Sequence, residues 1–264
     1  MKKQVKTNLF IILFIASFLV AFPFVIKAVG QKDTAEPSVS SQATAAQSQS
    51  ETVSQPKTTE TTAMTTESGV YTTVDPSYFD DALFIGDSRT VGLSEYSGLT
   101  NADYFASVGM SLYKIEKETV SVRSVGKMKL PDLLKAKKYG KIYVMLGIND
   151  LGYDLQKTIS RYQTLLQEIK TLQPDAILYV CANLHVTKMR SESDEVFTNA
   201  NIDKFNVALK TLAQQQNAYY IDINPVFDDG NGNLKDAYTS DNTHVLGRYY
   251  KEWGNWLCTQ AVVK

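Results

Sequence analysis

Histidine and cysteine are scarce in this 264-residue chain, which contains two of each. The histidines are His185 and His244, and the cysteines are Cys181 and Cys258. Their spacing does not match a zinc site, so we expect no metal centre. The 27 basic residues are balanced by 28 acidic ones, which argues against a nucleic-acid partner. A glycine-rich phosphate loop is also missing, which argues against a nucleotide-binding protein, and we expect no cofactor.

One long apolar run lies near the N-terminus. Residues 9–26 are apolar except for Ser17 and Pro23, and three lysines precede them. About 18 residues at 1.5 Å each span roughly 27 Å, close to the thickness of a bilayer. The run is longer than the core of a cleavable signal peptide, so we expect residues 1–30 to be a retained signal-anchor, with cleavage as the alternative. The lysines favour a cytoplasmic N-terminus, so the remainder is exported and the chain resides at the cell membrane or is secreted.

Large apolar residues are nearly absent from residues 31–75, which consist mainly of Ser, Thr, Gln, Ala and Glu. Such a segment buries too little surface to fold, so we expect a disordered tether. It either lets the domain work at a distance from the membrane or is a spacer without further role. Residues 76–264 have the length of one domain with a full core. In an oxidising exterior the two cysteines could form a disulfide, but each position is also ordinary for a buried thiol, which we favour.

The predicted domain alternates strands and helices. This pattern predicts a three-layer α/β/α sandwich with a five-stranded parallel sheet, of the flavodoxin-like kind. Residues 110–129 mix helical and β-branched signals and receive no assignment. The predicted strands are residues 82–85, 103–108, 141–146, 176–182 and 218–223, and the predicted helices begin at residue 89 and cover 130–138, 158–169, 197–216 and 246–262.

A hydroxyl and an imidazole are candidates for nucleophilic catalysis. Ser88 follows the first buried strand and opens a helix, so it should lie at the carboxyl edge of the sheet, with its backbone N–H free to meet an anion. His244 has a carboxylate three residues before it, so Asp241 can hold one ring nitrogen while the other faces Ser88. The alternatives are a serine that only caps a helix and a surface histidine beside a capping aspartate. Asp87 is interpreted as a turn former and local hydrogen-bond acceptor, not as a catalyst.

A third strand end carries Asn149, whose side-chain amide could donate a hydrogen bond to an oxyanion. The alternative is a turn former, and the neighbouring Asp150 could cap the next segment. In sequence order, these blocks resemble the SGNH (GDSL-type) hydrolases, a family of serine esterases and acylhydrolases. The resemblance extends from about residue 78 to the C-terminus and indicates a bacterial, membrane-anchored member. The matching blocks are Gly86-Asp87-Ser88, Gly109, Gly147-Ile148-Asn149-Asp150, Asp241 and His244.

The resemblance implies the SGNH fold and an oxyanion hole formed by Ser88, Gly109 and Asn149, although Gly109 could be a plain turn glycine. Two positions depart from the family pattern. Arg89 replaces the leucine of the GDSL label, and Asn242 stands where glycine is common. Arg89 either attracts an anionic substrate or forms a salt bridge at the surface. His185 also follows a strand, and either lines the substrate pocket or is a solvated loop residue.

The sequence thus predicts an extracytoplasmic serine esterase, tethered to the membrane, that removes a short acyl group, acetyl in the first instance, from an ester. Acylated glycans of the cell envelope are the expected substrates, because the enzyme would work near them. An O-acyltransferase on the same scaffold is one alternative, and a non-catalytic wall-binding module is another. The sequence predicts neither the natural substrate nor the oligomeric state.

Overall fold

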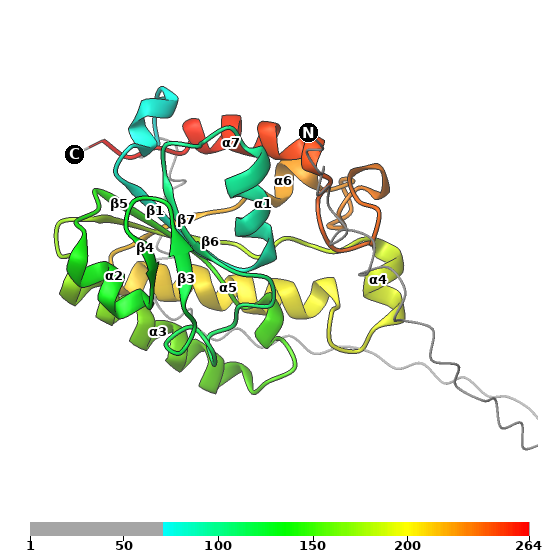
Figure 1. Ribbon diagram of the computed structural model, residues 1–264. Helices are drawn as coiled ribbons and strands as arrows, with labels where there is room; N and C mark the ends of the chain where they lie inside the picture. Colours follow the sequence, from blue (N-terminus) through cyan, green and yellow to red (C-terminus); the bar gives the residue numbers. More distant parts are fainter. Residues whose placement is uncertain (1–70, 264) are drawn as a thin grey trace, which may run out of the picture. The chain divides into compact units, whose positions relative to one another are not determined.

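A five-stranded parallel sheet forms the centre of the computed structural model, which describes residues 71–263 (Figure 1). The strand order is β2-β1-β5-β6-β7, and all four pairings are parallel. The order places β1 and β5, which precede Ser88 and Asn149, next to each other in the middle of the sheet. The strands are β1 (Ala82–Gly86), β2 (Asp103–Ala106), β5 (Lys141–Met145), β6 (Ile177–Cys181) and β7 (Tyr219–Ile221).

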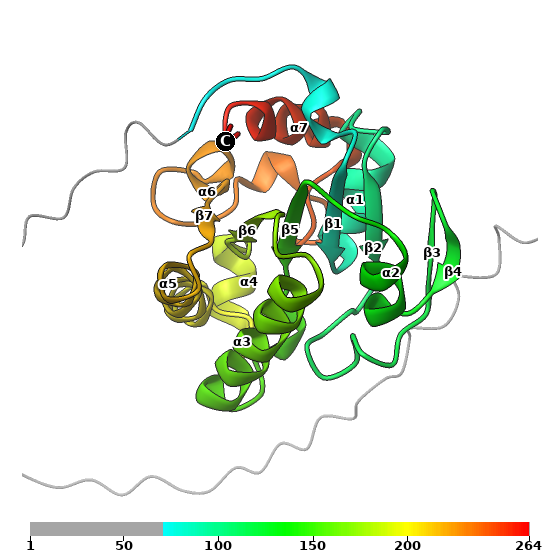
Figure 2. The same cartoon turned by 90° about the vertical axis from the view of Figure 1, so that its left-hand side faces the viewer.

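Helices cover both faces of this sheet, which confirms the predicted three-layer α/β/α sandwich. Figure 2 shows α7 on one side of the sheet and α3 on the other. Successive strand residues point to opposite faces, so Ile142 and Val144 join one buried cluster while Tyr143 and Met145 join the other. The helices are α1 (Ser88–Tyr96), α2 (Leu130–Ala136), α3 (Leu155–Leu172), α4 (Lys188–Ser193), α5 (Asn199–Gln215), α6 (Asn224–Phe227) and α7 (Tyr250–Cys258).

The two longest helices begin at side-chain caps. Asp154 accepts a hydrogen bond from the backbone N–H of Lys157, and Thr198 accepts one from Asn201. In α3 the buried residues recur every three or four positions, as the sequence predicts, and in α5 they do the same. The predicted core faces of both helices are therefore confirmed.

Three parts of the fold differ from the sequence prediction. The unassigned segment contains a short hairpin of β3 (Val120–Val122) and β4 (Gly126–Met128). Strands of three residues are too short to show a period in the sequence. The last helix is shorter than predicted, because residues 247–249 form a separate 3₁₀ turn before α7. The short helices α4 and α6 were not expected.

The start of the described chain pairs with its end. The backbone N–H of Thr72 donates to the carbonyl of Ala261 at 2.8 Å, and Val74 donates to Cys258 at 2.9 Å. The folded domain therefore begins before the predicted boundary at residue 76. The predicted anchor, and the predicted tether as far as residue 70, lie outside the described residues. Of the helices within residues 71–263, none combines the length and apolar character needed to cross a bilayer.

The two cysteines are unpaired. Cys181 ends β6 and Cys258 ends α7, and both are half-buried free thiols. Burial raises the pKa of Cys181 to about 12, so this side chain is a neutral thiol at physiological pH. The interpretation as ordinary core thiols is confirmed, and the disulfide is not formed.

Candidate active site

Ser88 is held at a tight strand-to-helix turn. A Cβ on Gly86 would come within 2.8 Å of the carbonyl oxygen of Met145, so the turn has room only for glycine. The buried side chain of Asp87 caps α1 by accepting a hydrogen bond from the N–H of Arg89 at 2.9 Å. Ser88 is the first residue of the helix, where backbone N–H groups have no partner within the helix. The interpretation of Asp87 as a local acceptor is confirmed.

The Ser88 hydroxyl meets the imidazole predicted for it. Ser88 Oγ lies 2.8 Å from Nε2 of His244, although 156 positions separate the two residues in sequence. On the other side of the ring, Nδ1 of His244 lies 2.7 Å from Oδ2 of Asp241. The structure therefore arranges a hydroxyl, an imidazole and a carboxylate in one hydrogen-bonded row. The His244 side chain is 43% exposed, so the row is open to solvent.

The carboxylate of Asp241 is held in its ionised form. Its Oδ1 accepts hydrogen bonds from the backbone N–H groups of Thr243, at 2.9 Å, and of His244, at 2.7 Å. Burial alone raises the pKa of Asp241, but these bonds and the imidazole outweigh it and lower the pKa to about 2. One oxygen of Asp241 thus shapes the loop, while the other orients the ring.

The loops that follow β2 and β5 are tied together beside this row. Nδ2 of Asn149 donates to the carbonyl of Met110 at 2.9 Å, and the next residue, Asp150, accepts from the N–H of Leu112 at 3.1 Å. Gly109 has φ +74°, and a Cβ placed there would meet no atom within 4 Å, so its backbone faces open space. The structure therefore brings Asn149 against the segment that contains Gly109.

Asp150 does not have the capping role that the sequence left open. The residue that caps α3 is Asp154. Asp150 is instead buried, and burial raises its pKa to about 6. Its position fixes the loop after β2 through the hydrogen bond from Leu112.

The side chain of Arg89 is 1% exposed. Its Nη2 donates to the carbonyl oxygen of Thr243 at 3.3 Å, within the loop that carries His244. Both expectations for Arg89 assumed an exposed guanidinium, and the structure places that group in the interior. In this position the guanidinium contacts the backbone of the loop that carries His244, and a substrate in solvent cannot reach it.

His185 also differs from both expectations. It is 8% exposed, its Nδ1 lies 2.8 Å from Asp228, and its Nε2 lies 2.9 Å from Asp203. Burial lowers the pKa of His185, but the two carboxylates outweigh burial and raise it to about 9. The residue is therefore a buried cation with both nitrogens occupied, neither a solvated loop residue nor a pocket group. Its partners are 18 and 43 positions away, and no local pattern marks them.

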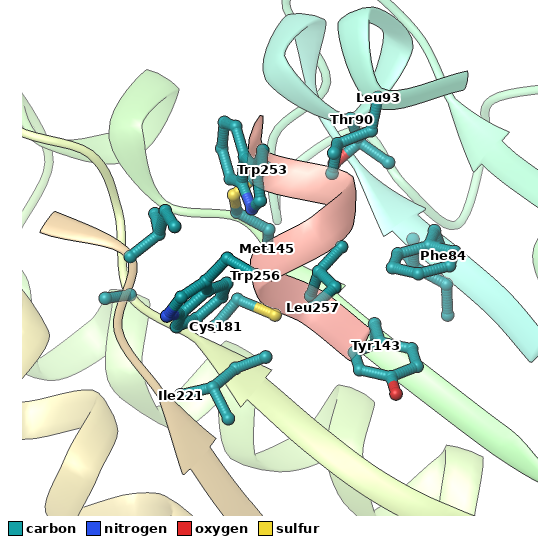
Figure 3. A pocket seen from close by; sticks show the side chains of 13 residues that line it. Phe84, Thr90, Leu93, Tyr143, Met145, Cys181, Ile221, Trp253, Trp256 and Leu257 are labelled. Atoms are coloured by element: carbon teal, nitrogen blue, oxygen red, sulfur yellow. The ribbon is translucent and has the colours of Figure 1, made fainter. Parts of the chain in front are cut away.

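An apolar cavity lies between the sheet and α7. Figure 3 shows the side chains of Met145, Cys181, Trp253 and Trp256 around it. Neither Ser88 nor His244 lines this cavity, and its volume of about 10 Å³ holds roughly one water molecule. It is a gap in core packing, separate from the row of polar groups. Across residues 71–263, no cluster of three or more His, Cys, Asp or Glu side chains could hold a metal ion.

The chain is similar to known hydrolases. The model of the GDSL-like lipase/acylhydrolase family matches residues 84–251, well over half of the chain. No curated protein matches. A GDSL-like lipase from Bacteroides thetaiotaomicron has 15% identity and a TM-score of 0.53, covering 69% of this chain and 87% of that one.

Two further solved structures have the same fold. A Bacteroides fragilis protein described as a candidate acylhydrolase has 16% identity and a TM-score of 0.52, covering 67% of this chain and 83% of its own. A Streptococcus pneumonia protein described as a candidate platelet activating factor has 20% identity and a TM-score of 0.52, covering 69% and 88%. At these identities the likeness shows the fold alone. The family match shows more: this chain belongs to the GDSL-like lipase/acylhydrolase family and is an SGNH hydrolase.

Proposed function

We propose that this hydrolase is a serine esterase with Ser88 as nucleophile, His244 as general base and Asp241 as the residue that orients the imidazole. One observation carries the proposal: the hydrogen-bonded row from Ser88 Oγ through His244 to Asp241, with contacts of 2.8 and 2.7 Å. These are the separations that proton transfer between a nucleophile and its base requires. The row combines segments from opposite ends of the domain, so it is not a product of local turn geometry.

The reaction follows from the positions of these groups. Ser88 Oγ attacks the ester carbonyl carbon while its proton passes to Nε2 of His244. The oxyanion would accept hydrogen bonds from the N–H groups of Ser88 and Gly109 and from Nδ2 of Asn149. One N–H of that amide is already bonded to Met110, which aims the group and leaves its second N–H for the oxyanion.

The same groups complete the turnover. When the tetrahedral intermediate collapses, His244 gives its proton to the departing alcohol, leaving an acyl group on Ser88. Water then attacks this acyl-enzyme, and its proton passes to His244. The second tetrahedral intermediate then collapses: the bond between the acyl carbon and Ser88 Oγ breaks, His244 returns its proton to Oγ, and the carboxylic acid leaves with one oxygen that came from water. The ester and water are the only reactants, and no redox step is needed.

The open site supports a short acyl group on a large alcohol. The side chains of His244 and Asp241 are 43% and 53% exposed, so a bulky alcohol can approach them from solvent. The apolar cavity beneath α7 offers no path for a long acyl chain, because it does not include Ser88. We therefore propose an acetyl ester, carried by a glycan of the cell envelope. An extracytoplasmic site, with residues 1–30 as membrane anchor, agrees with such a substrate.

Hydrolysis of p-nitrophenyl esters tests the proposal. The purified protein should hydrolyse the acetate faster than the butyrate and octanoate. Ser88→Ala should lower kcat by about a thousandfold or more, because the nucleophile is lost. Ser160→Ala, a matched change at an exposed serine of α3, should leave kcat unchanged. Failure of a fluorophosphonate probe to label the wild-type protein at Ser88 would contradict the proposal.

The exposed side chains of His244 and Asp241 leave room for an alcohol to attack the acyl-enzyme in place of water. An O-acyltransferase is therefore the second candidate. The chemistry up to the acyl-enzyme is identical, and only the acceptor differs. Supplying a sugar acceptor with p-nitrophenyl acetate separates the two. Free acetate as the only product supports the esterase, whereas an acetylated sugar that forms in preference to acetate supports the transferase.

A further inference from the structure

The turn that carries His244 has an unusual backbone conformation. Asn242 has φ +66°, in the left-handed region that residues other than glycine rarely adopt. Asparagine tolerates this region better than most side chains. The conformation fixes the relation between Asp241 and His244, because Asn242 and Thr243 are the only residues between them. Contacts that hold Asn242 in place therefore also set the position of the imidazole.

Thr187 holds Asn242 at both its backbone and its side chain. The N–H of Thr187 donates to the carbonyl oxygen of Asn242 at 3.0 Å, and its hydroxyl donates to Oδ1 of Asn242 at 3.1 Å. Thr187 is fully buried, so its own donor groups are shielded from water. Its hydroxyl oxygen also accepts from the N–H of Arg190 at 3.3 Å, as the cap of α4. With donor and acceptor both engaged, the hydroxyl has one orientation.

The segment that contains Thr187 is itself fixed from several sides. The N–H groups of the two preceding residues, His185 and Val186, donate to the side chains of Asn224 and Asn199, at 2.8 and 2.9 Å. The ring of His185 is clamped between two carboxylates. A displacement of Thr187 would break these buried bonds, so the residue is a rigid support and not a mobile contact.

From these contacts we propose that Thr187 is a positioning residue for catalysis: its two hydrogen bonds to Asn242 set the turn that places Nε2 of His244 against Ser88. The inference rests on the proposed roles of Ser88 and His244. Thr187 does not touch the reacting atoms. Arg89 supports the same turn at Thr243, so two buried side chains hold the two residues between Asp241 and His244.

The test compares Thr187→Val, which removes the hydroxyl at constant shape, with Thr187→Ser, which keeps it. Two rates are measured: kcat for p-nitrophenyl acetate and the labelling of Ser88 by a fluorophosphonate, which requires no knowledge of the natural substrate. Misplacement of the base should lower both rates by roughly tenfold to a hundredfold in Thr187→Val, with KM nearly unchanged. Thr187→Ser should restore both to within about threefold. Thr211→Val, on the exposed side of α5, is the matched control.

A double-mutant cycle with Asn242→Gly isolates the contact. Glycine adopts the same φ without strain but lacks the side-chain acceptor, so Asn242→Gly should lower the labelling rate by about threefold to tenfold. Thr187→Val should then cost less in that background than in the wild type. Fully additive losses would overturn the inference, as would a wild-type labelling rate in Thr187→Val.

The remaining outcomes are also decisive. If Thr187→Val does not fold, Asn242→Gly decides alone, and an unchanged labelling rate at unchanged Tm overturns the inference. The proposed function fails separately, if Ser88→Ala is labelled and hydrolyses ester as the wild type does. A wild-type protein that reacts only through Ser88, together with an indifferent Thr187→Val, rejects the positioning role and leaves the esterase intact.

Discussion

The two histidines of this chain lie in opposite environments, although each is bonded to aspartate. His244 is 43% exposed and has one carboxylate on Nδ1 and a serine hydroxyl on Nε2. His185 is 9% exposed at its side chain and has a carboxylate on each nitrogen. A general base needs one nitrogen free to receive a proton. His244 has such a nitrogen, whereas the two carboxylates hold His185 protonated, so only one of the imidazoles can serve as a base.

The largest effect should come from His244→Gln. Glutamine cannot take the proton of Ser88, so we expect kcat for p-nitrophenyl acetate to fall by about a thousandfold or more, with little change in the free energy of unfolding because the side chain is half exposed. Steady-state kinetics and urea unfolding measure the two quantities. His185→Gln is the matched variant, and it should lose stability before activity. Equal losses of activity in the two variants would contradict the assignment of a catalytic role to His244 and a structural role to His185.

Asp241→Asn should have the next largest effect, about a hundredfold to a thousandfold in kcat. The amide cannot stabilise the imidazolium, and it can present an N–H where Nδ1 needs an acceptor. Because the pKa of Asp241 is about 2, its charge is lost only as pH falls through that value. Plots of kcat/KM against pH should therefore show no limb from Asp241 between about pH 4 and pH 9. If the wild-type profile has a limb in that range and the profile of Asp241→Asn lacks it, the low pKa of Asp241 is contradicted.

His185→Gln should lower the free energy of unfolding by about 2–4 kcal/mol at pH 6, because Asp228 then lacks its buried cation. The folded-state pKa of about 9 lies above the ordinary value of 6.5. The stabilisation is therefore complete below about pH 6.5 and is lost as pH rises through about 9. Urea unfolding at pH 6, 7.5 and 9 should show the difference between wild type and variant shrinking. A difference that is constant across the three pH values would disprove the buried cation.

The same two histidines show what sequence could predict. The site around His244 consists of short local signals: a strand that ends in Gly86-Asp87-Ser88, and a carboxylate three residues before an imidazole. Each signal follows from local geometry, and the parallel sheet brings the strand ends to one edge. The serine–histidine contact was therefore within reach of the sequence.

The environment of His185 was not within reach, because its partners lie on α5 and after α6. The same holds for the buried position of Arg89 and for the contact between Thr187 and Asn242, which join segments 154 and 55 positions apart. The hairpin β3–β4 was missed for a different reason, since its strands have three residues each. Periodicity predicts elements and their buried faces, but it does not predict which polar side chains meet in the interior.

The smallest effect concerns Arg89, whose charge lies beneath the loop of His244. Arg89→Met keeps most of the side-chain volume and removes the bond to the carbonyl of Thr243. We expect kcat/KM to fall by roughly tenfold, because the loop loses one of its two buried supports. Burial already raises the pKa of Asp87, and loss of the neighbouring guanidinium should raise it further. The capping bond from the N–H of residue 89 is retained.

Substrate charge decides between the two roles of Arg89. A guanidinium that is 1% exposed cannot contact an ester from solvent, so neutral and anionic acyl esters should lose activity equally in Arg89→Met. Arg161→Met, at an exposed arginine of α3, controls for the change in net charge. A loss confined to anionic esters would mean that the side chain reaches the substrate, and would require the loop of His244 to open during binding. Equal losses would place Arg89 with Thr187, as a support of the base and not a determinant of specificity.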